Sequence, residues 1–233
     1  SIPSIGLRAS WFESANTRNG SMRIEDLLRH SARQYRGKTA VICGEERCSY
    51  EWVYDESTRR ANDLLHGGIR PGSRVRLCLE NSIDLIVWMF AVAIARSTFF
   101  IVSPQARPER LETLSTDAGA AALVVRDNAH VTIRARQTPG AAEPSSEDLA
   151  ALVYTSGSTG TPKAVIRTHA NICAAAASIN VYLENTPDDV ILSALPLSFT
   201  YGLGQVMTTS RVGATLVLER SFTYPGAILD TLA

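Results

Sequence analysis

Short apolar stretches alternate with longer amphipathic segments along most of this chain. The short stretches are bounded by turn-forming residues, as strands are, whereas the longer segments repeat apolar residues at helical spacing. Strands are expected at 39–42, 47–50, 74–79, 98–102, 121–125, 149–153, 164–167, 190–193 and 214–218. Helices are expected from residue 22, from residue 51 to Gly67–Gly68, and at 83–94, 108–118, 171–183 and 203–211.

The alternation predicts an α/β fold of doubly wound, mainly parallel sheet layers with flanking helices. Thr98–Val102 is almost wholly apolar, which is typical of a strand buried on both faces of a parallel sheet. Gly44–Glu45 is expected to turn the first strand back into the second. Arg134–Glu147 is rich in Pro, Gly, Ala and Glu and is expected to be an exposed connection.

Two of the helices are expected to bury one apolar side each. In the helix after residue 50, that side consists of Trp52, Val53, Ala61, Leu64 and Leu65. In the helix at 83–94, it consists of Ile83, Ile86, Val87, Phe90 and Ile94. Gly67–Gly68 is suited to a left-handed helix end, and Pro108 to a first helical turn. Either Thr168 or Asn171 is expected to cap the Ala-rich helix that follows.

Composition excludes several classes of partner. The chain is 45% hydrophobic with equal acid and base counts and a pI near 6.9, which argues against nucleic acid or an anionic membrane as the main partner. The sequence holds no apolar run of about 18 residues and no basic-then-apolar signal at its start. We therefore expect a cytoplasmic protein. Residues 1–21 lack a sustained period and are expected to be an arm or a remnant of processing or cloning.

The four cysteines, Cys43, Cys48, Cys78 and Cys173, are scattered and lack metal-ligand spacing. Buried free thiols are expected, because free cysteine prefers protein interiors. Cys43 and Cys48 are expected to face each other across the first hairpin, close together but without a disulfide in a reducing compartment.

A run of small, hydroxylated, Gly, Pro and Lys residues follows the apolar stretch Leu149–Val153. It reads Tyr-Thr-Ser-Gly-Ser-Thr-Gly-Thr-Pro-Lys from Tyr154 to Lys163. Glycines let backbone amides approach an anion, and hydroxyls with an ammonium supply further donors, so the run predicts a phosphate-holding loop. The predicted phosphate ligands are Thr155, Ser156, Gly157, Ser158, Thr159, Gly160 and Lys163. A solvated linker is the alternative, but it does not explain the apolar strands on both sides.

A nucleotide-hydrolase P-loop is the nearest rival signature. It requires Gly before the lysine and Ser or Thr after it, where this chain has Pro162 and Ala164. A helix should also follow, but Val165–Ile166 is a β-branched pair. The sequence therefore disfavours a P-loop ATPase.

The run resembles the phosphate-loop motif of the adenylate-forming superfamily, which comprises acyl-CoA synthetases, peptide-synthetase adenylation domains and luciferases. That motif reads Tyr-Thr-Ser-Gly-(Ser/Thr)-Thr-Gly-x-Pro-Lys-Gly-Val, and the chain departs from it only at Ala164. Weaker likenesses occur in order at Cys48–Glu51, at Glu80–Ser82, and at Ala95–Pro104, where Arg96 and Ile101 replace the usual residues. The resemblance extends from Met22 to the end of the chain.

The resemblance implies that a small carboxylic acid attacks the α-phosphate of ATP to give an acyl-adenylate and pyrophosphate. Coenzyme A, or the phosphopantetheine of an acyl or peptidyl carrier protein, then takes the acyl group. Thr155 and Lys163 are the implied catalytic residues, with the loop hydroxyls and amides holding the departing phosphates. Mg²⁺ is expected to be held by phosphate oxygens, so no protein metal ligands are predicted.

A second stretch, Leu195–Gln205, resembles the acyl-pocket segment of the same family. On that alignment Phe199, Thr200, Tyr201 and Gly204 line the acyl pocket. Thr200 stands where amino-acid activators carry an aspartate for the substrate ammonium, so an acid without a free α-amine is favoured. The alternative is a strand-to-helix turn packed by core aromatics. His169 is interpreted as a residue satisfied at a helix start rather than a substrate contact.

The resemblance further implies that residues 22–233 are the N-terminal part of an AMP-binding domain. Residues 74–179 would build one sheet subdomain, and 22–68 with 190–233 part of a second. The adenine-binding, ribose-binding and C-terminal segments of the family are expected beyond Ala233, so we expect a fragment that is inactive alone. The alternative is a truncated, non-catalytic module that binds a nucleotide or a carrier protein.

Overall fold

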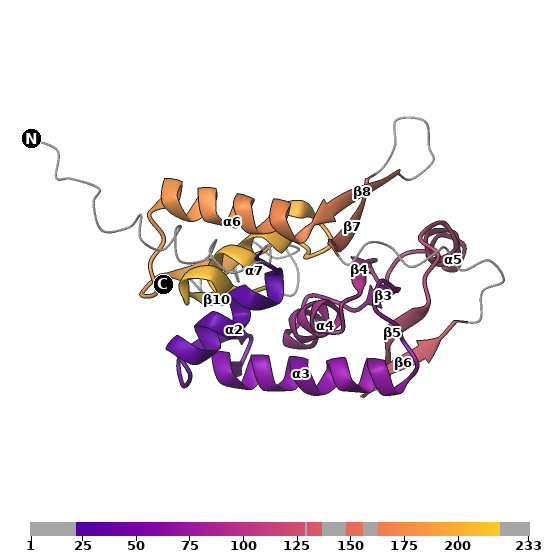
Figure 1. Cartoon of the computed structure of the whole chain (residues 1–233), viewed down its shortest axis with the longest axis horizontal. Helices are drawn as coiled ribbons and strands as arrows, with labels where there is room; N and C mark the ends of the chain where they lie inside the picture. Colours follow the sequence, from indigo (N-terminus) through magenta and orange to yellow (C-terminus); the bar gives the residue numbers. More distant parts are fainter. Residues whose placement is uncertain (1–21, 129, 137–147, 156–162, 220–233) are drawn as a thin grey trace, which may run out of the picture.

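Two β-sheets, one of six strands and one of four, form the framework of the molecule (Figure 1). The structure is a computed structural model that describes residues 22–128, 130–136, 148–155 and 163–219. Both sheets have parallel strands at their centres and helices packed around them, which confirms the predicted α/β fold.

The six-stranded sheet has the order β6-β5-β3-β4-β7-β8. Its strands are β3 (Arg74–Cys78), β4 (Thr98–Ile101), β5 (Ala122–Asp127), β6 (His130–Ala135), β7 (Leu149–Thr155) and β8 (Lys163–Thr168). The four central strands are parallel, whereas β6 and β8 run antiparallel at the two edges. Antiparallel pairing lets each edge strand return directly from its neighbour without a crossover helix.

The four-stranded sheet has the order β2-β1-β10-β9. Its strands are β1 (Thr39–Cys43), β2 (Glu46–Ser49), β9 (Val190–Ser193) and β10 (Thr215–Leu218). The first two form the predicted hairpin, and β1, β10 and β9 are parallel. Segments from both ends of the described chain therefore share one sheet.

The helix α4 lies at the centre of the fold and packs against strands of both sheets, β3 and β4 on one side and β1 on the other. The helices are α2 (Ile24–Gln34), α3 (Tyr50–His66), α4 (Ile83–Ile94), α5 (Pro108–Asp117), α6 (His169–Leu183) and α7 (Thr200–Val212). Residues 85–93 of α4 are all buried, so the prediction of a single apolar side was wrong. Because neighbours surround α4, an all-apolar sequence is stable there.

The buried side of α3 also differs from the expected one. It consists of Tyr50, Val53, Ser57, Ala61 and Leu64, which recur at intervals of three and four residues. Trp52 and Leu65 fall outside this series and are 46% and 43% exposed, so their predicted burial was wrong. The helix ends as predicted, with Gly68 in the left-handed conformation at φ +84°.

The strand β6 was not predicted, and the expectation that Arg134 begins an exposed connection was wrong, because Arg134 and Ala135 belong to this strand. Val131 and Ile133 alternate with polar residues and pack against the core, as in a half-buried edge strand. Asn128, at φ +54°, lies in the turn between β5 and β6. The rest of the expected connection, 137–147, lies outside the described residues.

The cysteines are free, as predicted, and three of them, Cys43, Cys78 and Cys173, are buried. Burial raises the pKa of the Cys173 thiol to about 12, which keeps it protonated. Cys43 pairs with Glu46, and Cys48 with Val41, in the β1–β2 register. The prediction that these two cysteines face each other was therefore wrong.

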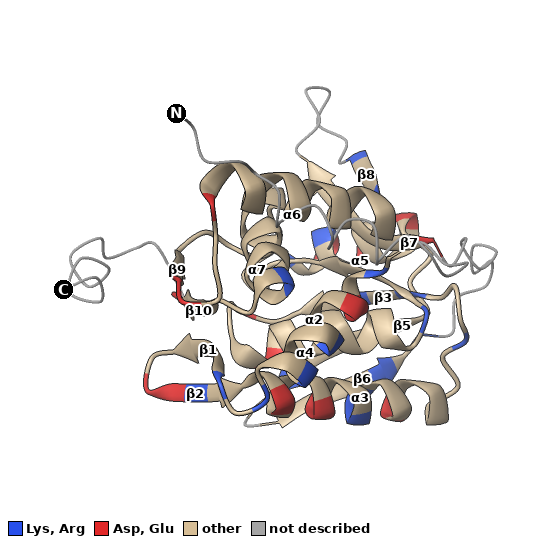
Figure 2. Ribbon diagram, turned by 60° about the vertical axis from the view of Figure 1, so that its left-hand side comes forward, with Lys and Arg blue, Asp and Glu red and all other residues tan. Residues whose placement is uncertain are grey.

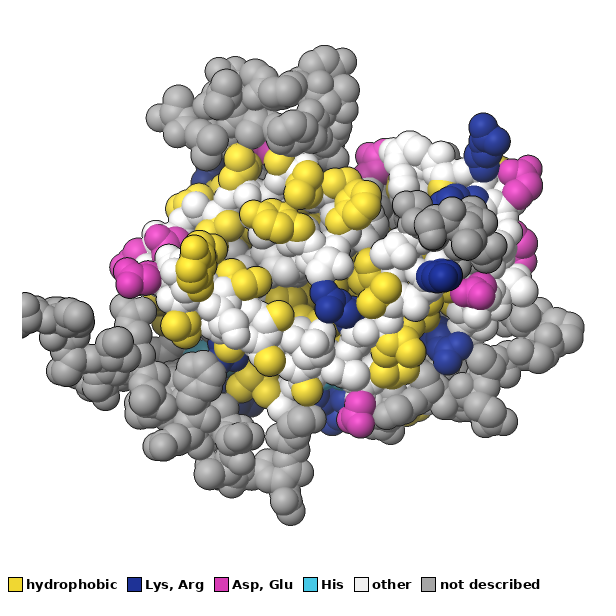
Figure 3. Space-filling view, turned by 90° about the horizontal axis from the view of Figure 1, so that it is seen from above, with side chains coloured by type: hydrophobic (Ala, Val, Ile, Leu, Met, Phe, Trp, Pro, Cys, Tyr) yellow, Lys and Arg dark blue, Asp and Glu magenta, His cyan; other side chains and the backbone are white. Residues whose placement is uncertain are grey.

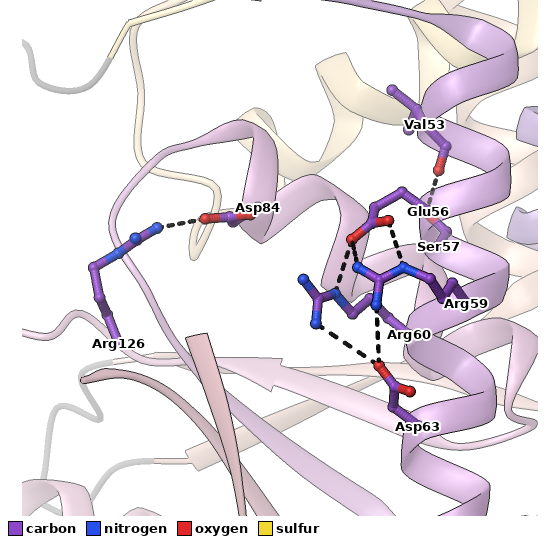
Figure 4. Close-up of polar contacts among 8 residues, drawn as sticks. All are labelled: Val53, Glu56, Ser57, Arg59, Arg60, Asp63, Asp84 and Arg126. Atoms are coloured by element: carbon purple, nitrogen blue, oxygen red, sulfur yellow. Dashed lines mark hydrogen bonds and ion pairs between the residues drawn. The ribbon is translucent and has the colours of Figure 1, made fainter. Parts of the chain in front are cut away.

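Acidic and basic side chains alternate along the outer side of α3 (Figure 2). Glu56 contacts Arg59 and Arg60, and both arginines approach Asp63 at 3.8 and 3.7 Å (Figure 4). Arg59 is exposed and the other three residues are half-buried, so these surface pairs each contribute about 0–1 kcal/mol to stability.

The top face of the molecule, by contrast, carries a broad group of hydrophobic side chains (Figure 3). Exposed apolar residues of β8 and α6 contribute to this group: Val165, Ile166, Ile179, Val181, Tyr182 and Leu183. The exposed fraction of these side chains ranges from 39% for Ile179 to 85% for Tyr182.

Residues near both ends of the described chain are tied together around the four-stranded sheet. The Tyr50 hydroxyl donates to the carbonyls of Thr209 and Ala214 at 3.0 and 2.5 Å. Gly213 ends α7 at φ +83°, and a Cβ there would lie 2.3 Å from the ring of Tyr35. Only glycine therefore fits at this junction.

We expect Gly213→Ala to lower the free energy of unfolding by about 1–3 kcal/mol, since the methyl group combines backbone strain with a clash. Gly37→Ala is the matched control, because a Cβ at Gly37 meets no atom within 4 Å. Chemical denaturation of both variants measures the effect. Equal stability of the two variants would contradict the prediction.

Candidate functional site

The β7–β8 hairpin brings Thr155 and Lys163 together. The two residues are direct partners across the antiparallel pair, and the Thr155 hydroxyl donates to the Lys163 carbonyl at 3.4 Å. Directly opposed residues point to the same face of a sheet, so hydroxyl and ammonium lie on one face of the hairpin. Both side chains are exposed. The other predicted phosphate ligands, Ser156, Gly157, Ser158, Thr159 and Gly160, lie outside the described residues.

The strand β7 holds the Thr155 side of the hairpin rigidly. It lies between β4 and β8, and Ala150, Ala151, Leu152 and Val153 are buried. Tyr154 donates its hydroxyl hydrogen to Asp117 of α5 at 2.7 Å and meets the ring of Phe100 edge-on at 5.9 Å. Burial and the hydrogen bond to Asp117 raise the pKa of Tyr154, so its hydroxyl stays protonated and remains a donor. The carboxyl end of β7 is thus anchored to its own sheet layer.

The helix α6 starts directly after β8 and is fixed by three contacts. Thr168 caps it by accepting the amide hydrogen of Asn171 at 3.1 Å, as predicted. The His169 amide donates to the Asp148 carbonyl at 3.0 Å, and the Ile24 amide donates to His169 Nδ1 at 3.2 Å. The last contact joins the base of the hairpin to the first residue of α2.

His169 is a buried, neutral residue rather than a surface group. It is 1% exposed, and burial, with Arg23 and Arg96 nearby, lowers its pKa to about 3. Glu25 Oε2 lies 3.7 Å from Nδ1, but Nδ1 already accepts the Ile24 amide hydrogen, so we interpret this approach as a contact without an ionic bond. The interpretation of His169 as a residue satisfied at a helix start therefore holds for Nδ1 alone, because the buried Nε2 has no hydrogen-bond partner among the described residues.

The predicted acyl-pocket residues cluster at the start of α7. Phe199 is the residue that precedes the helix, and Thr200 and Tyr201 are its first two residues. Phe199 is 59% and Tyr201 64% exposed, so neither aromatic ring packs in the core. Gly204 is half-buried, and a Cβ there would point into open space. The observed surface therefore does not match the alternative of a turn packed by core aromatics.

Gly202 shapes this region, although sequence reasoning did not assign it a role. A Cβ at Gly202 would lie 2.6 Å from the Pro196 carbonyl oxygen and 3.0 Å from that of Leu195. The Phe199 amide donates to the same Pro196 carbonyl at 3.0 Å. The first turn of α7 therefore rests directly on the turn that follows β9. The sequence signals at this position were a glycine within an otherwise helical segment and the resemblance of Leu195–Gln205 to the family's acyl-pocket segment.

The sequence profile of the family described as AMP-binding enzyme matches residues 28–233. The chain belongs to this family. Phosphinothricin tripeptide synthetase PhsC of Streptomyces viridochromogenes is 32% identical over 230 residues, which cover 90% of this chain and 21% of PhsC. Tyrocidine synthase 3 of Brevibacillus parabrevis is 28% identical over 225 residues, which cover 90% of this chain and 4% of the synthase. The chain thus spans a small part of these relatives.

Two solved structures share the fold. MbtA of Mycobacterium smegmatis superimposes with a TM-score of 0.78 and 26% identity, over 98% of this chain and 49% of MbtA. The O-succinylbenzoate coenzyme A synthetase MenE of Bacillus subtilis, solved with AMP, gives a TM-score of 0.75 at 22% identity, which supports the fold alone. The chain covers 58% of that structure. Family and fold are therefore as predicted, whereas the roles of individual site residues stay predictions.

No helix in the described part of this AMP-binding chain is long and apolar enough to cross a bilayer. Among the same residues, no group of three or more His, Cys, Asp or Glu side chains is arranged to hold a metal ion.

The neutrality of His169 predicts a pH dependence of stability. Because its pKa is lowered from 6.5 to about 3 by folding, the unfolded chain binds a proton that the folded chain excludes as the pH falls below 6.5. This contribution is fully present above pH 6.5 and is lost on acidification, by about 2 kcal/mol between pH 7 and 5.

The control is His169→Asn, which keeps a polar acceptor near Ile24 but does not titrate. The difference in unfolding free energy between the native protein and this variant should shrink by about 2 kcal/mol from pH 7 to pH 5. Identical pH slopes would show that His169 is not held neutral.

Proposed function

We propose that this chain carries the ATP-dependent activation of a small carboxylic acid as an acyl-adenylate, with release of pyrophosphate. The observation that carries the proposal is the β7–β8 hairpin, which places Thr155 and Lys163 side by side at the carboxyl end of a parallel strand. Ligands of open α/β sheets bind at such ends. Membership of the AMP-binding enzyme family, and a tripeptide synthetase among the relatives, support the same reaction.

In the proposed step, a carboxylate oxygen of the acid bonds to the α-phosphorus of ATP, and the bond from that phosphorus to the bridging oxygen breaks. Pyrophosphate leaves with the electron pair. Thr155 and Lys163 would hold its phosphate oxygens, together with Ser156, Gly157, Ser158, Thr159 and Gly160. Positioning and charge stabilisation are the protein's contribution to such a transfer. Mg²⁺ would accompany ATP on the phosphate oxygens.

The acid would bind at the start of α7, against Phe199, Thr200, Tyr201 and Gly204. The two exposed aromatic rings offer apolar surface, and the open space at Gly204 leaves room for the acyl chain. Thr200 provides a hydroxyl and no charge. We therefore propose an acid that lacks a free α-ammonium group.

The thiol acceptor would be coenzyme A or the phosphopantetheine of a carrier protein, and acyl transfer to it would follow in the full enzyme. The tripeptide synthetase among the relatives supports a carrier-protein acceptor.

A cytoplasmic location is favoured because the reaction consumes ATP. We also propose two sheet subdomains, 74–179 and 22–68 with 190–233, a division supported by which strands share each sheet.

Lys163→Ala should slow acid-dependent exchange of pyrophosphate into ATP by about 100- to 1,000-fold, measured in the complete natural protein, because a charged donor to the transition state is lost. The unfolding temperature should not change, since Lys163 is exposed. Arg47→Ala, an exposed cation on the edge strand β2, serves as the control and should exchange at the native rate. An unchanged rate for Lys163→Ala would refute its assignment.

Thr200 generates a prediction about substrates. In matched pairs of acids with and without an α-amino group, kcat/KM should favour the acid without it by about 30- to 3,000-fold, the cost of a buried ammonium without a counter-charge. Pyrophosphate exchange across such pairs measures the ratio. A preference for the α-amino acids would place a carboxylate elsewhere in the pocket.

A further inference from the structure

Asn81 follows β3 in the loop that leads to α4, and its side chain is buried and fully engaged. It is 8% exposed. Its Nδ2 donates to the carbonyls of Leu195 and Glu219 at 3.2 and 3.1 Å, and its Oδ1 accepts the Leu197 amide hydrogen at 3.0 Å. One amide thus holds three backbone groups that lie more than a hundred residues away in the sequence.

These contacts join the two sheets at their carboxyl ends. Asn81 stands just beyond β3 of the six-stranded sheet, whereas its partners follow β9 and β10 of the four-stranded sheet. The Glu219 amide in turn donates to the Ser193 carbonyl at 2.9 Å, which ties the ends of β9 and β10 to each other. Within the described chain, Asn81 is therefore a polar junction between the layers.

The loop that carries Asn81 is itself fixed. Ser82 accepts the Leu85 amide hydrogen at 3.2 Å as the cap of α4, and its hydroxyl donates to the Glu80 carbonyl at 3.0 Å. The side-chain Nε2 of Gln105 donates to the Glu80 carboxylate at 2.9 Å. A rigid loop gives Asn81 a fixed point from which to hold the other sheet.

From Asn81 the contacts continue to the predicted acid site. Leu195 and Leu197 flank Pro196, whose carbonyl accepts the Phe199 amide hydrogen and lies against Gly202. The first turn of α7, with Thr200, is thus set by a turn that Asn81 holds from both sides of Pro196.

The same junction relates the acid site to the hairpin. The strands β3 and β7 flank β4, so their carboxyl ends lie about 10 Å apart at the ordinary spacing of strands. Asn81 therefore connects the turn before α7 to the sheet that carries Thr155 and Lys163.

We propose that Asn81 is a positioning residue that holds the acid-binding turn in register with the phosphate-holding hairpin. This inference rests on the proposed function. An amide suits the role because it offers donors and an acceptor at once, whereas aspartate has no donor and leucine has neither. A misplacement of about 1 Å at a reacting centre can cost about 100-fold in rate.

The test compares Asn81→Asp with Asn180→Asp in the complete natural protein. Asn180 is a matched control, since it is 6% exposed and its Nδ2 donates to the Thr208 carbonyl at 3.0 Å, in the second half of α7. Asn81→Asp should lower kcat/KM for the acid in pyrophosphate exchange by about 10- to 100-fold, with KM for ATP changed less than about threefold. Asn180→Asp should lower the unfolding temperature, but it should not lower kcat/KM for the acid selectively while KM for ATP stays nearly constant.

A folded Asn81→Asp with native kcat/KM for the acid, or an equal loss in both variants, would overturn the inference. If the aspartate variant does not fold, Asn81→Ala, which leaves room for water at a site that is 8% exposed, should give the same split.

Amide hydrogen exchange separates this inference from the proposed function. In the Asn81 variants, residues 195–203 should exchange faster than in the native protein, and in Asn180→Asp they should not. If the native protein shows no acid-dependent exchange of pyrophosphate, the proposed function fails, and faster amide exchange would still support the junction. Unchanged exchange at 195–203 would refute the junction itself.

Discussion

The burial of α4 between the two sheets is the interaction on which the structure depends. Its side chains from Leu85 to Ala93 are removed from water on every side of the helix. A buried Leu, Ile, Phe or Met side chain contributes about 1.5–3 kcal/mol, so this one helix supplies a large share of the apolar stabilisation. Because it contacts β1, β3 and β4, it also sets how the two sheets lie with respect to each other.

Both halves of the candidate site stand at strand ends that this arrangement aligns. Thr155 lies at the carboxyl end of β7, and the acid-binding turn follows the carboxyl end of β9. Each of these strands has a parallel neighbour. Apolar packing of α4 is not directional, and so it does not by itself fix the fine register between two layers. Hydrogen bonds are directional, and Asn81 lies in the loop between β3 and α4. The directional hydrogen bonds of Asn81 are therefore next in the chain to the apolar packing of α4.

Much of the fold could be predicted from the sequence, because local patterns encode it. Strand and helix positions follow from periodicity, the Thr168 cap from its side chain, and the left-handed Gly68 from its place at a helix end. The failures have two causes. The exposure of Trp52 depends on neighbours distant in the chain, whereas the burial of α4 on all sides follows from a segment that is apolar apart from Asp84, which the expectation of a single apolar side did not use.

The candidate site divides in the same way. Thr155 and Lys163 belong to a continuous motif and could be predicted, as could the stretch around Thr200. Asn81 and Gly202 lie in stretches that resemble the family, but their contacts with backbone carbonyls could not be predicted, because those of Asn81 are with residues more than a hundred positions away and that of Gly202 depends on the turn before α7. Sequence reasoning finds the residues that offer chemical groups, and it misses those that hold the backbone behind them.

The hairpin is anchored unequally at its two ends. Thr155 ends a strand that pairs with β4 at Ala151 and Leu152 and with β8 along its length, whereas Lys163 begins an edge strand that pairs, among the described residues, with β7 alone. Opening β8 breaks one ladder of hydrogen bonds, but opening β7 breaks two and exposes buried core, so the two strands differ in local unfolding free energy. Lys163 therefore begins the strand that opens at the lower cost, and Thr155 ends the strand that opens at the higher cost, so the two sides of the hairpin differ in how readily they can move.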